Sequence, residues 1–192
     1  NDWAGYAENL REVVRLAREE ARCLAAVTGL APYDALMDQY EPGMRSAEGD
    51  RVFGDLRQWL PGLIREVLER QSHEQVIRPE PPFALAAQKA LGHDAMHLMG
   101  FDFEAGRLDE SAHPFCGGVP EDVRMTTRYR EDSFLQSLTG TIHETGHGRY
   151  EQNLPREWLG LPIAQARSMG LHESQSLSFE MQLASHPGFA GL

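Results

Sequence analysis

The chain has 192 residues, of which 41% are hydrophobic and 24% charged, as is typical of one globular domain. Its formal net charge of −11 argues against nucleic acid or an anionic membrane as a partner. There is no apolar run long enough to cross a membrane and no visible signal peptide, so we expect a cytoplasmic protein.

The first 99 residues have the hydrophobic spacing of a helical scaffold. Apolar residues recur three and four positions apart, which predicts amphipathic helices. Pro61 suits the first position of a helix, so we expect one helix to end before it and another to begin there. The expected helices cover residues 2–28, 32–40, 46–60, 61–75 and 83–99, with a proline-rich link over 78–82.

The last of these helices contains two histidines four residues apart, His93 and His97. Such a pair can bind a metal ion, but an aspartate, Asp94, follows the first histidine, and the sequence shows no third ligand. We therefore interpret both residues as ordinary core or surface histidines.

Glycine and proline residues between positions 101 and 120 interrupt any helical pattern. One strand is then predicted over residues 123–129, which are rich in β-branched and aromatic side chains. Alternation places Arg124 and Arg128 on one face and Val123 on the other. Because this is the only convincing strand, we expect a small sheet.

A helical pattern resumes over 132–153 and contains the sequence H-E-x-x-H, in which His143 and His147 flank Glu144. Histidines four apart lie one turn from each other on one face, where both can bind the same metal ion. The glutamate can reach a water in the open position of the metal, as the general base of a zinc peptidase does. A chain of this composition would contain the motif by chance only about 0.03 times.

Two glycines in the same helix, Gly140 and Gly146, lower its helix propensity by about 1 kcal/mol each relative to alanine. Such a cost suits a helix whose backbone is closely approached by another element.

A catalytic zinc needs three protein ligands and one open position. Glu173 lies 26 residues after His147, on a helix predicted over 168–184, and would complete a His₂Glu set if the two helices pack side by side. His172 is the competing third ligand, because neighbouring helix positions point about 100° apart and only one can face the metal. A surface position for Glu173 is the remaining alternative.

These residues predict a peptidase mechanism. Glu144 would take a proton from the attacking water and pass it to the departing amine. An exopeptidase that acts at a C-terminus also needs a cation for the terminal carboxylate, and Arg124 and Arg128 are the candidates. The alternative for the arginines is a solvated edge strand.

Several segments together resemble the carboxypeptidase Taq family of zinc metallocarboxypeptidases, in order and spacing. They are Tyr33-Asp34-Ala35-Leu36 to Tyr40-Glu41-Pro42-Gly43-Met44, His113-Pro114-Phe115, Asp122-Val123-Arg124-Met125-Thr126 with Thr127-Arg128-Tyr129, His143-Glu144-Thr145-Gly146-His147 and His172-Glu173-Ser174-Gln175-Ser176. The resemblance implies a mainly α, groove-type fold with one small β-sheet next to the HExxH helix. It also implies Glu173 as third ligand and a substrate cleft near His113 and Arg124. The implied activity is the release of C-terminal amino acids from peptides by a homodimeric, zinc-dependent hydrolase in which cobalt can substitute.

Members of that family are much longer, and this chain starts without methionine, so we expect a fragment. We divide its single catalytic-core portion, residues 1–192, into a helical scaffold (1–99), a small β region (100–131) and metal-site helices (132–192). We expect the fragment to bind zinc with weak or no peptidase activity alone. The alternatives are a helical binding or assembly domain whose metal site is structural or vacant, and a related oligopeptidase.

Overall fold

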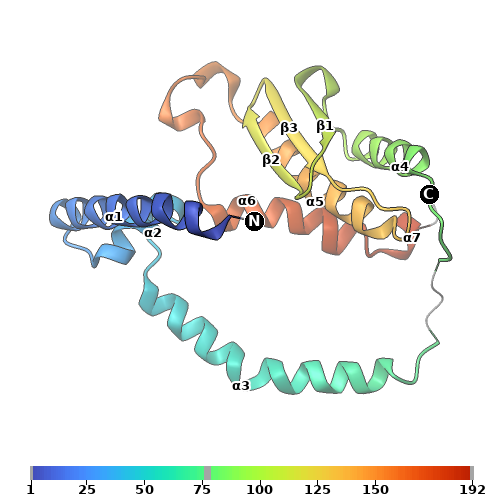
Figure 1. Cartoon of the computed structure of the whole chain (residues 1–192), viewed down its shortest axis with the longest axis horizontal. Helices are drawn as coiled ribbons and strands as arrows, with labels where there is room; N and C mark the ends of the chain where they lie inside the picture. Colours follow the sequence, from blue (N-terminus) through green and yellow to red (C-terminus); the bar gives the residue numbers. More distant parts are fainter. Residues whose placement is uncertain (1, 76–78, 191–192) are drawn as a thin grey trace. The chain divides into compact units, whose positions relative to one another are not determined.

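The computed structural model of the chain describes residues 2–75 and 79–190 and divides it into two compact units, Asn1–Ile77 and Arg78–Leu192 (Figure 1). The protein is mainly helical with one small sheet, as the sequence predicted. The three-part division of the chain stays a prediction. Among the described residues, no helix is both long and apolar enough to cross a membrane.

The N-terminal unit consists of three helices, α1 (Trp3–Thr28), α2 (Pro32–Tyr40) and α3 (Ser46–Gln71). The Asp2 carboxylate accepts a hydrogen bond from the Gly5 amide at the start of α1, and Gly29 ends the helix in the left-handed conformation at φ 73°. Helix α2 packs against α1.

The predicted break at Pro61 is wrong, because α3 continues through this residue. Proline cannot donate the hydrogen bond to the carbonyl of Arg57, and its ring crowds that carbonyl, which kinks a helix without necessarily ending it. Figure 1 shows that α3 changes direction part way along its length. The helical pattern on both sides of Pro61 is strong enough to keep one helix.

The C-terminal unit begins with α4 (Leu85–Leu98) and the short 3₁₀ turn η1 (Phe103–Ala105), followed by a three-stranded sheet. The strand order is β1-β3-β2, with β1 parallel and β2 antiparallel to β3. The predicted strand is present and ends two residues early, while the flanking strands were missed because glycine and charged residues occupy them. The strands are β1 (Gly106–Glu110), β2 (Phe115–Val119) and β3 (Asp122–Thr127).

Helix α5 (Leu135–Gln152) packs against β2 and β3, as Figure 1 shows. After two 3₁₀ turns, η2 (Arg156–Trp158) and η3 (Pro162–Ala164), the chain forms α6 (Met169–Leu177), which continues into a π-helical segment, η4 (Ser178–Leu183). A short helix, α7 (Pro187–Ala190), follows. The single helix predicted over 168–184 is therefore two segments with different winding.

Two clusters of buried apolar side chains form the core of this unit. One cluster joins Met96, Phe101, Val123 and Met125, and a second joins Ala95, Met99 and Ile142. The face of β3 predicted to include Val123 is buried together with Met125 and Thr127, but Thr126 on the opposite face is buried as well. This packing holds α5 on the sheet and leaves its other side for α6.

Candidate metal centre

Two glycines on opposite sides of α5 let it fit between the sheet and α6. A Cβ atom at Gly148 would lie 2.9 Å from the Met125 sulfur on the sheet side. A Cβ atom at Gly146 would lie 2.5 Å from the Cα atom of Ser176, in the backbone of α6. The close approach predicted at Gly146 is confirmed. Gly140 has only ordinary contacts at 3.7 Å, and the role of Gly148 was missed.

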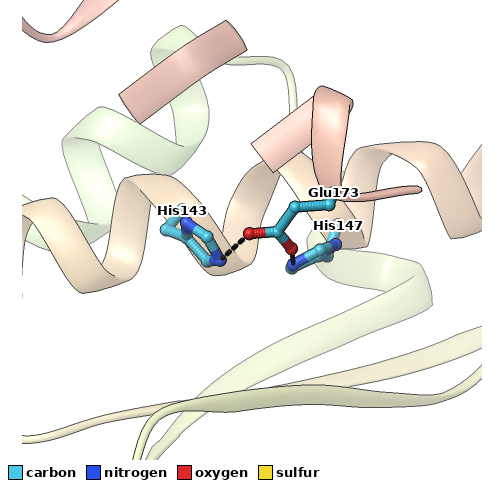
Figure 2. A group of neighbouring side chains, drawn as sticks. All are labelled: His143, His147 and Glu173. Atoms are coloured by element: carbon cyan, nitrogen blue, oxygen red, sulfur yellow. Dashed lines mark ion pairs between the residues drawn. The ribbon is translucent and has the colours of Figure 1, made fainter. Parts of the chain in front are cut away.

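The contact at Gly146 places Glu173 over the two histidines of the motif. The Nε2 atom of His147 lies 3.3 Å from one carboxylate oxygen of Glu173, and Nε2 of His143 lies 3.9 Å from the other (Figure 2). The candidate ligand atoms of the three residues are all within 4.8 Å of one another. The structure therefore brings together the three residues that the sequence predicted as metal ligands.

The donor set suits zinc. Two imidazole nitrogens and one carboxylate form a known catalytic zinc set, and ligands of a tetrahedral zinc with bonds of about 2.0–2.2 Å lie about 3.3–3.6 Å apart. The candidate ligand atoms here lie within 4.8 Å of one another, a limit more than 1 Å wider than that spacing, so a bound ion would require the side chains to move inwards.

Both histidines are also held through their other ring nitrogen. Nδ1 of His143 lies 2.7 Å from a carboxylate oxygen of Glu180 in η4. Nδ1 of His147 lies 2.6 Å from Nδ1 of His172, whose Nε2 in turn lies 2.7 Å from the Glu151 carboxylate. These contacts leave both Nε2 atoms turned towards Glu173, as metal ligation requires.

His172, the competing third ligand, contacts the outer nitrogen of His147 rather than the space between the ligands. The geometry therefore favours Glu173 over the His₃ alternative. The surface interpretation of Glu173 is also incomplete, because its side chain is 48% exposed but lies against both histidines.

Glu144 is buried, with only 7% of its surface exposed. Burial raises its pKa, the carboxylates of Glu173 and Glu180 act in the same direction, and His143 and His113 oppose them. Burial also lowers the pKa of His147; the neighbouring His172 and His143 act in the same direction, and Glu173 opposes them. A buried base next to a neutral imidazole is the electrostatic setting that a catalytic metal site needs.

The three predicted substrate-binding residues lie in different settings. His113 is exposed just before β2, and it acts to lower the pKa of Glu144. Arg124 is exposed on β3 and its guanidinium binds the Asp122 carboxylate at 2.7 Å. Arg128 is exposed beyond the end of β3. The structure thus connects His113 to the site more directly than either arginine.

Residues that support the ligands were missed by sequence reasoning, although their spacing carries a signal. Glu151 follows His147 by four positions, so it continues the face of α5 on which both histidines lie. Glu180 follows Glu173 by seven positions, or about two helical turns. Cys116 on β2 also faces this region; burial and the charges of Glu144 and Glu151 raise its pKa to about 12, so the thiol stays protonated.

The second histidine pair has a different environment. The rings of His93 and His97 pack against Phe103, with centroid distances of 4.1 and 4.6 Å. Over residues 2–75 and 79–190, the cluster of His143, His147 and Glu173 is the only group of three or more His, Cys, Asp or Glu side chains placed to hold a metal ion. The interpretation of the second pair as ordinary histidines agrees with this packing.

An HExxH helix whose histidines meet a glutamate from a following helix is the arrangement of a metallopeptidase. The profile of the Carboxypeptidase Taq (M32) metallopeptidase family matches residues 1–192, and the chain belongs to this family.

Two curated relatives illustrate the extent of the similarity. Thermostable carboxypeptidase 1 of Thermus thermophilus is 41% identical over 197 residues, covering 98% of this chain and 39% of that protein. Carboxypeptidase 1 of Bacillus subtilis is 40% identical over 150 residues, covering 78% of this chain and 30% of that protein. The chain thus spans well under half the length of these relatives.

Among solved structures, Trypanosoma cruzi metallocarboxypeptidase 1 has a TM-score of 0.84 and 50% sequence identity, over 96% of this chain and 37% of that one. The carboxypeptidase of Pyrococcus furiosus has a TM-score of 0.72 and 34% identity, over 88% and 34% of the two chains. The family and fold predicted from the sequence motifs are confirmed.

Proposed function

We propose that this chain is the metal-binding core of a zinc-dependent metallocarboxypeptidase that releases C-terminal amino acids from peptides. The observation that carries the proposal is the meeting of His143, His147 and Glu173 beside the buried Glu144. Family membership supports the same reaction class.

His143, His147 and Glu173 would hold the metal. A bound zinc ion supplies a Lewis acid that polarises the scissile carbonyl and makes water a better nucleophile. Glu144 acts as the general base and then as the general acid: it accepts a proton from the attacking water and delivers it to the departing amine nitrogen. Its raised pKa suits both steps, because a carboxylate that takes up a proton more readily is a better base at neutral pH.

The substrate carboxylate would be bound by His113, Arg124 and Arg128. Arg124 is paired with Asp122, so its guanidinium would have to leave the Asp122 carboxylate or bind the peptide carboxylate in addition to it. His113 is supported by its electrostatic effect on Glu144. Family resemblance, rather than any contact in this chain, is the basis for expecting a homodimer and for expecting cobalt to replace zinc.

A structural metal site is the alternative from another functional class. Structural zinc is normally closed by four protein ligands. The cluster offers three, and Glu144, the residue that follows His143, has a buried side chain that a structural site does not need. The geometry therefore favours a catalytic centre.

The test combines zinc content with amino acid release, measured on the wild-type chain, on Glu144→Gln and on Glu157→Gln, an exposed glutamate of the same unit. We expect about one zinc ion per chain in all three. Release of single C-terminal residues, followed by mass spectrometry over long incubations, should be weak and should fall about 100- to 10,000-fold in Glu144→Gln alone.

A chain that binds no zinc would refute the metal site. Release that survives Glu144→Gln would refute the role of this glutamate, and internal cleavage fragments would favour an oligopeptidase.

A further inference from the structure

The Nδ1 atoms of the two ligand histidines contact different groups. His143 contacts the Glu180 carboxylate directly, whereas a second imidazole, that of His172, stands between His147 and the carboxylate of Glu151. A short contact between two ring nitrogens, here 2.6 Å, needs a proton on one of them and a lone pair on the other.

The carboxylate of Glu151, the last group in this series of contacts, determines where the protons lie. An ionised Glu151 only accepts hydrogen bonds, so Nε2 of His172 carries the proton that it donates. A neutral His172 then has a lone pair at Nδ1 and accepts from Nδ1–H of His147. His147 is left with its lone pair at Nε2, the atom that faces Glu173 at 3.3 Å.

We propose that His172 and Glu151 are positioning residues, which fix His147 in the Nδ1–H tautomer and so present its Nε2 lone pair to the metal. This inference rests on the proposed metal site. His172 therefore acts in the site as a relay rather than as a ligand, and Glu151 acts on the metal through two imidazole rings.

The relay is shielded and held in place. The side chains of His147 and His172 are each 15% exposed and that of Glu151 is 24% exposed, so water competes poorly for these hydrogen bonds. The Tyr150 ring packs edge-on against His172, with centroids 4.9 Å apart at 74°, and fixes the plane of the imidazole.

The N-terminal unit contains the same pair of groups without the shielding. Glu69 lies in α3 and His73 lies just beyond its end. The Glu69 carboxylate and the His73 ring are 3.4 Å apart, and their side chains are 78% and 76% exposed. Exposed pairs of this kind contribute little and hold no fixed geometry. Glu69 is therefore a matched control for Glu151.

The first test reads the tautomers directly, by long-range ¹H–¹⁵N NMR of the metal-free 192-residue chain near pH 7.5. We expect a protonated Nδ1 and an unprotonated Nε2 for His147, and the reverse for His172. A proton on Nε2 of His147, or protons on both nitrogens of His172, would overturn the proposal. This readout needs neither bound metal nor activity, so it decides the relay even if the metal site fails.

The second test measures zinc affinity by competition with a chelator of known affinity. Without the acceptor, in Glu151→Ala, His172 is free to reverse its tautomer, so the affinity should fall about 10- to 100-fold. Glu151→Gln keeps an acceptor oxygen and should recover most of the loss, while Glu69→Ala should stay within about twofold of wild type. If Glu151→Ala keeps both the wild-type tautomers and the wild-type affinity, Glu151 is not a positioning residue.

Discussion

The two units of the chain differ in how much apolar surface they bury. In the described helices of the N-terminal unit, only Ala21 and Ala35 are buried, and large side chains such as Val27 and Phe53 are 87% and 67% exposed. The C-terminal unit buries Met96, Met125 and Ile142 completely and has buried hydroxyl groups among them.

The comparison shows what an amphipathic pattern does and does not predict. Spacing of three and four produced the helices of both units, but only the C-terminal unit covers their apolar faces within itself. Because burial of apolar surface is the main favourable term in folding, the unit that contains the site should also be the one that unfolds cooperatively. Substitutions placed in equivalent pairs, one in each unit, test this difference.

The largest difference is expected for truncation of apolar side chains. Met125→Ala leaves a cavity beneath β3, where the side chain is fully buried, and should lower the free energy of unfolding by about 2–5 kcal/mol. Phe53→Ala on α3 should change it by about 0.5 kcal/mol or less. Urea unfolding followed by circular dichroism measures both, and equal effects would show that the N-terminal unit is also packed.

Glycine substitutions should give the next largest difference, with opposite signs. Gly146→Ala places a methyl group against the backbone of α6 and should cost about 1–3 kcal/mol as well as displace Glu173. Gly54→Ala, in α3, meets nothing within 4 Å and should stabilise its helix by about 0.5–1 kcal/mol.

Thermal unfolding and zinc affinity report the two effects of Gly146→Ala. Zinc affinity unchanged in this variant would contradict the role given to the contact between α5 and α6.

A smaller effect is expected from pH. The folded state lowers the pKa of His147 below its ordinary 6.5, so the unfolded chain takes up this proton first as the pH falls. The contribution of His147 to stability is therefore present above pH 6.5 and is lost as the pH falls towards the lower folded-state value.

Urea unfolding of the metal-free protein between pH 7.5 and 6 should show this loss in wild type and less of it in His147→Gln. His73→Gln, an exposed histidine of the N-terminal unit, should behave as wild type. Staying above pH 6 reduces the opposite contribution of Glu144, whose raised pKa favours the folded state on acidification. A slope that is the same in all three proteins would disprove the assignment to His147.

The smallest effect on stability is expected for Asp122→Asn. Both members of the Asp122–Arg124 pair are about half exposed, at 50% and 48%, so its loss should leave the unfolding midpoint unchanged within error. The variant frees the Arg124 guanidinium, which should strengthen binding of a short peptide with a free C-terminal carboxylate in NMR titrations. An amidated peptide is the control, and equal binding of both peptides would remove Arg124 from substrate recognition.

Much of this molecule was predictable because its signals are local. Helix periodicity predicted α1, α2, α4 and α5 nearly to their ends, and the HExxH spacing predicted two candidate ligands on one helical face. Family motifs selected Glu173, and the packing at Gly146 agrees with that choice.

The features that were missed depend on tertiary contacts. β1 and β2 have weak strand propensity and are held by β3, while Pro61 is tolerated because the residues around it favour a helix. The identity of the groups behind the histidines depends on where α6 lies, which no single segment specifies.

The contact at Gly146 has a consequence for how the site would fail. The position of Glu173 depends on contact between the backbone of α5 at Gly146 and the backbone of α6 at Ser176. Unlike a side chain, a backbone segment cannot restore a lost contact by changing its rotamer. Such a backbone contact is rigid, whereas a contact between side chains can weaken gradually. The ligand geometry should therefore persist under mild heating and then disappear in one step, when α6 leaves the surface of α5.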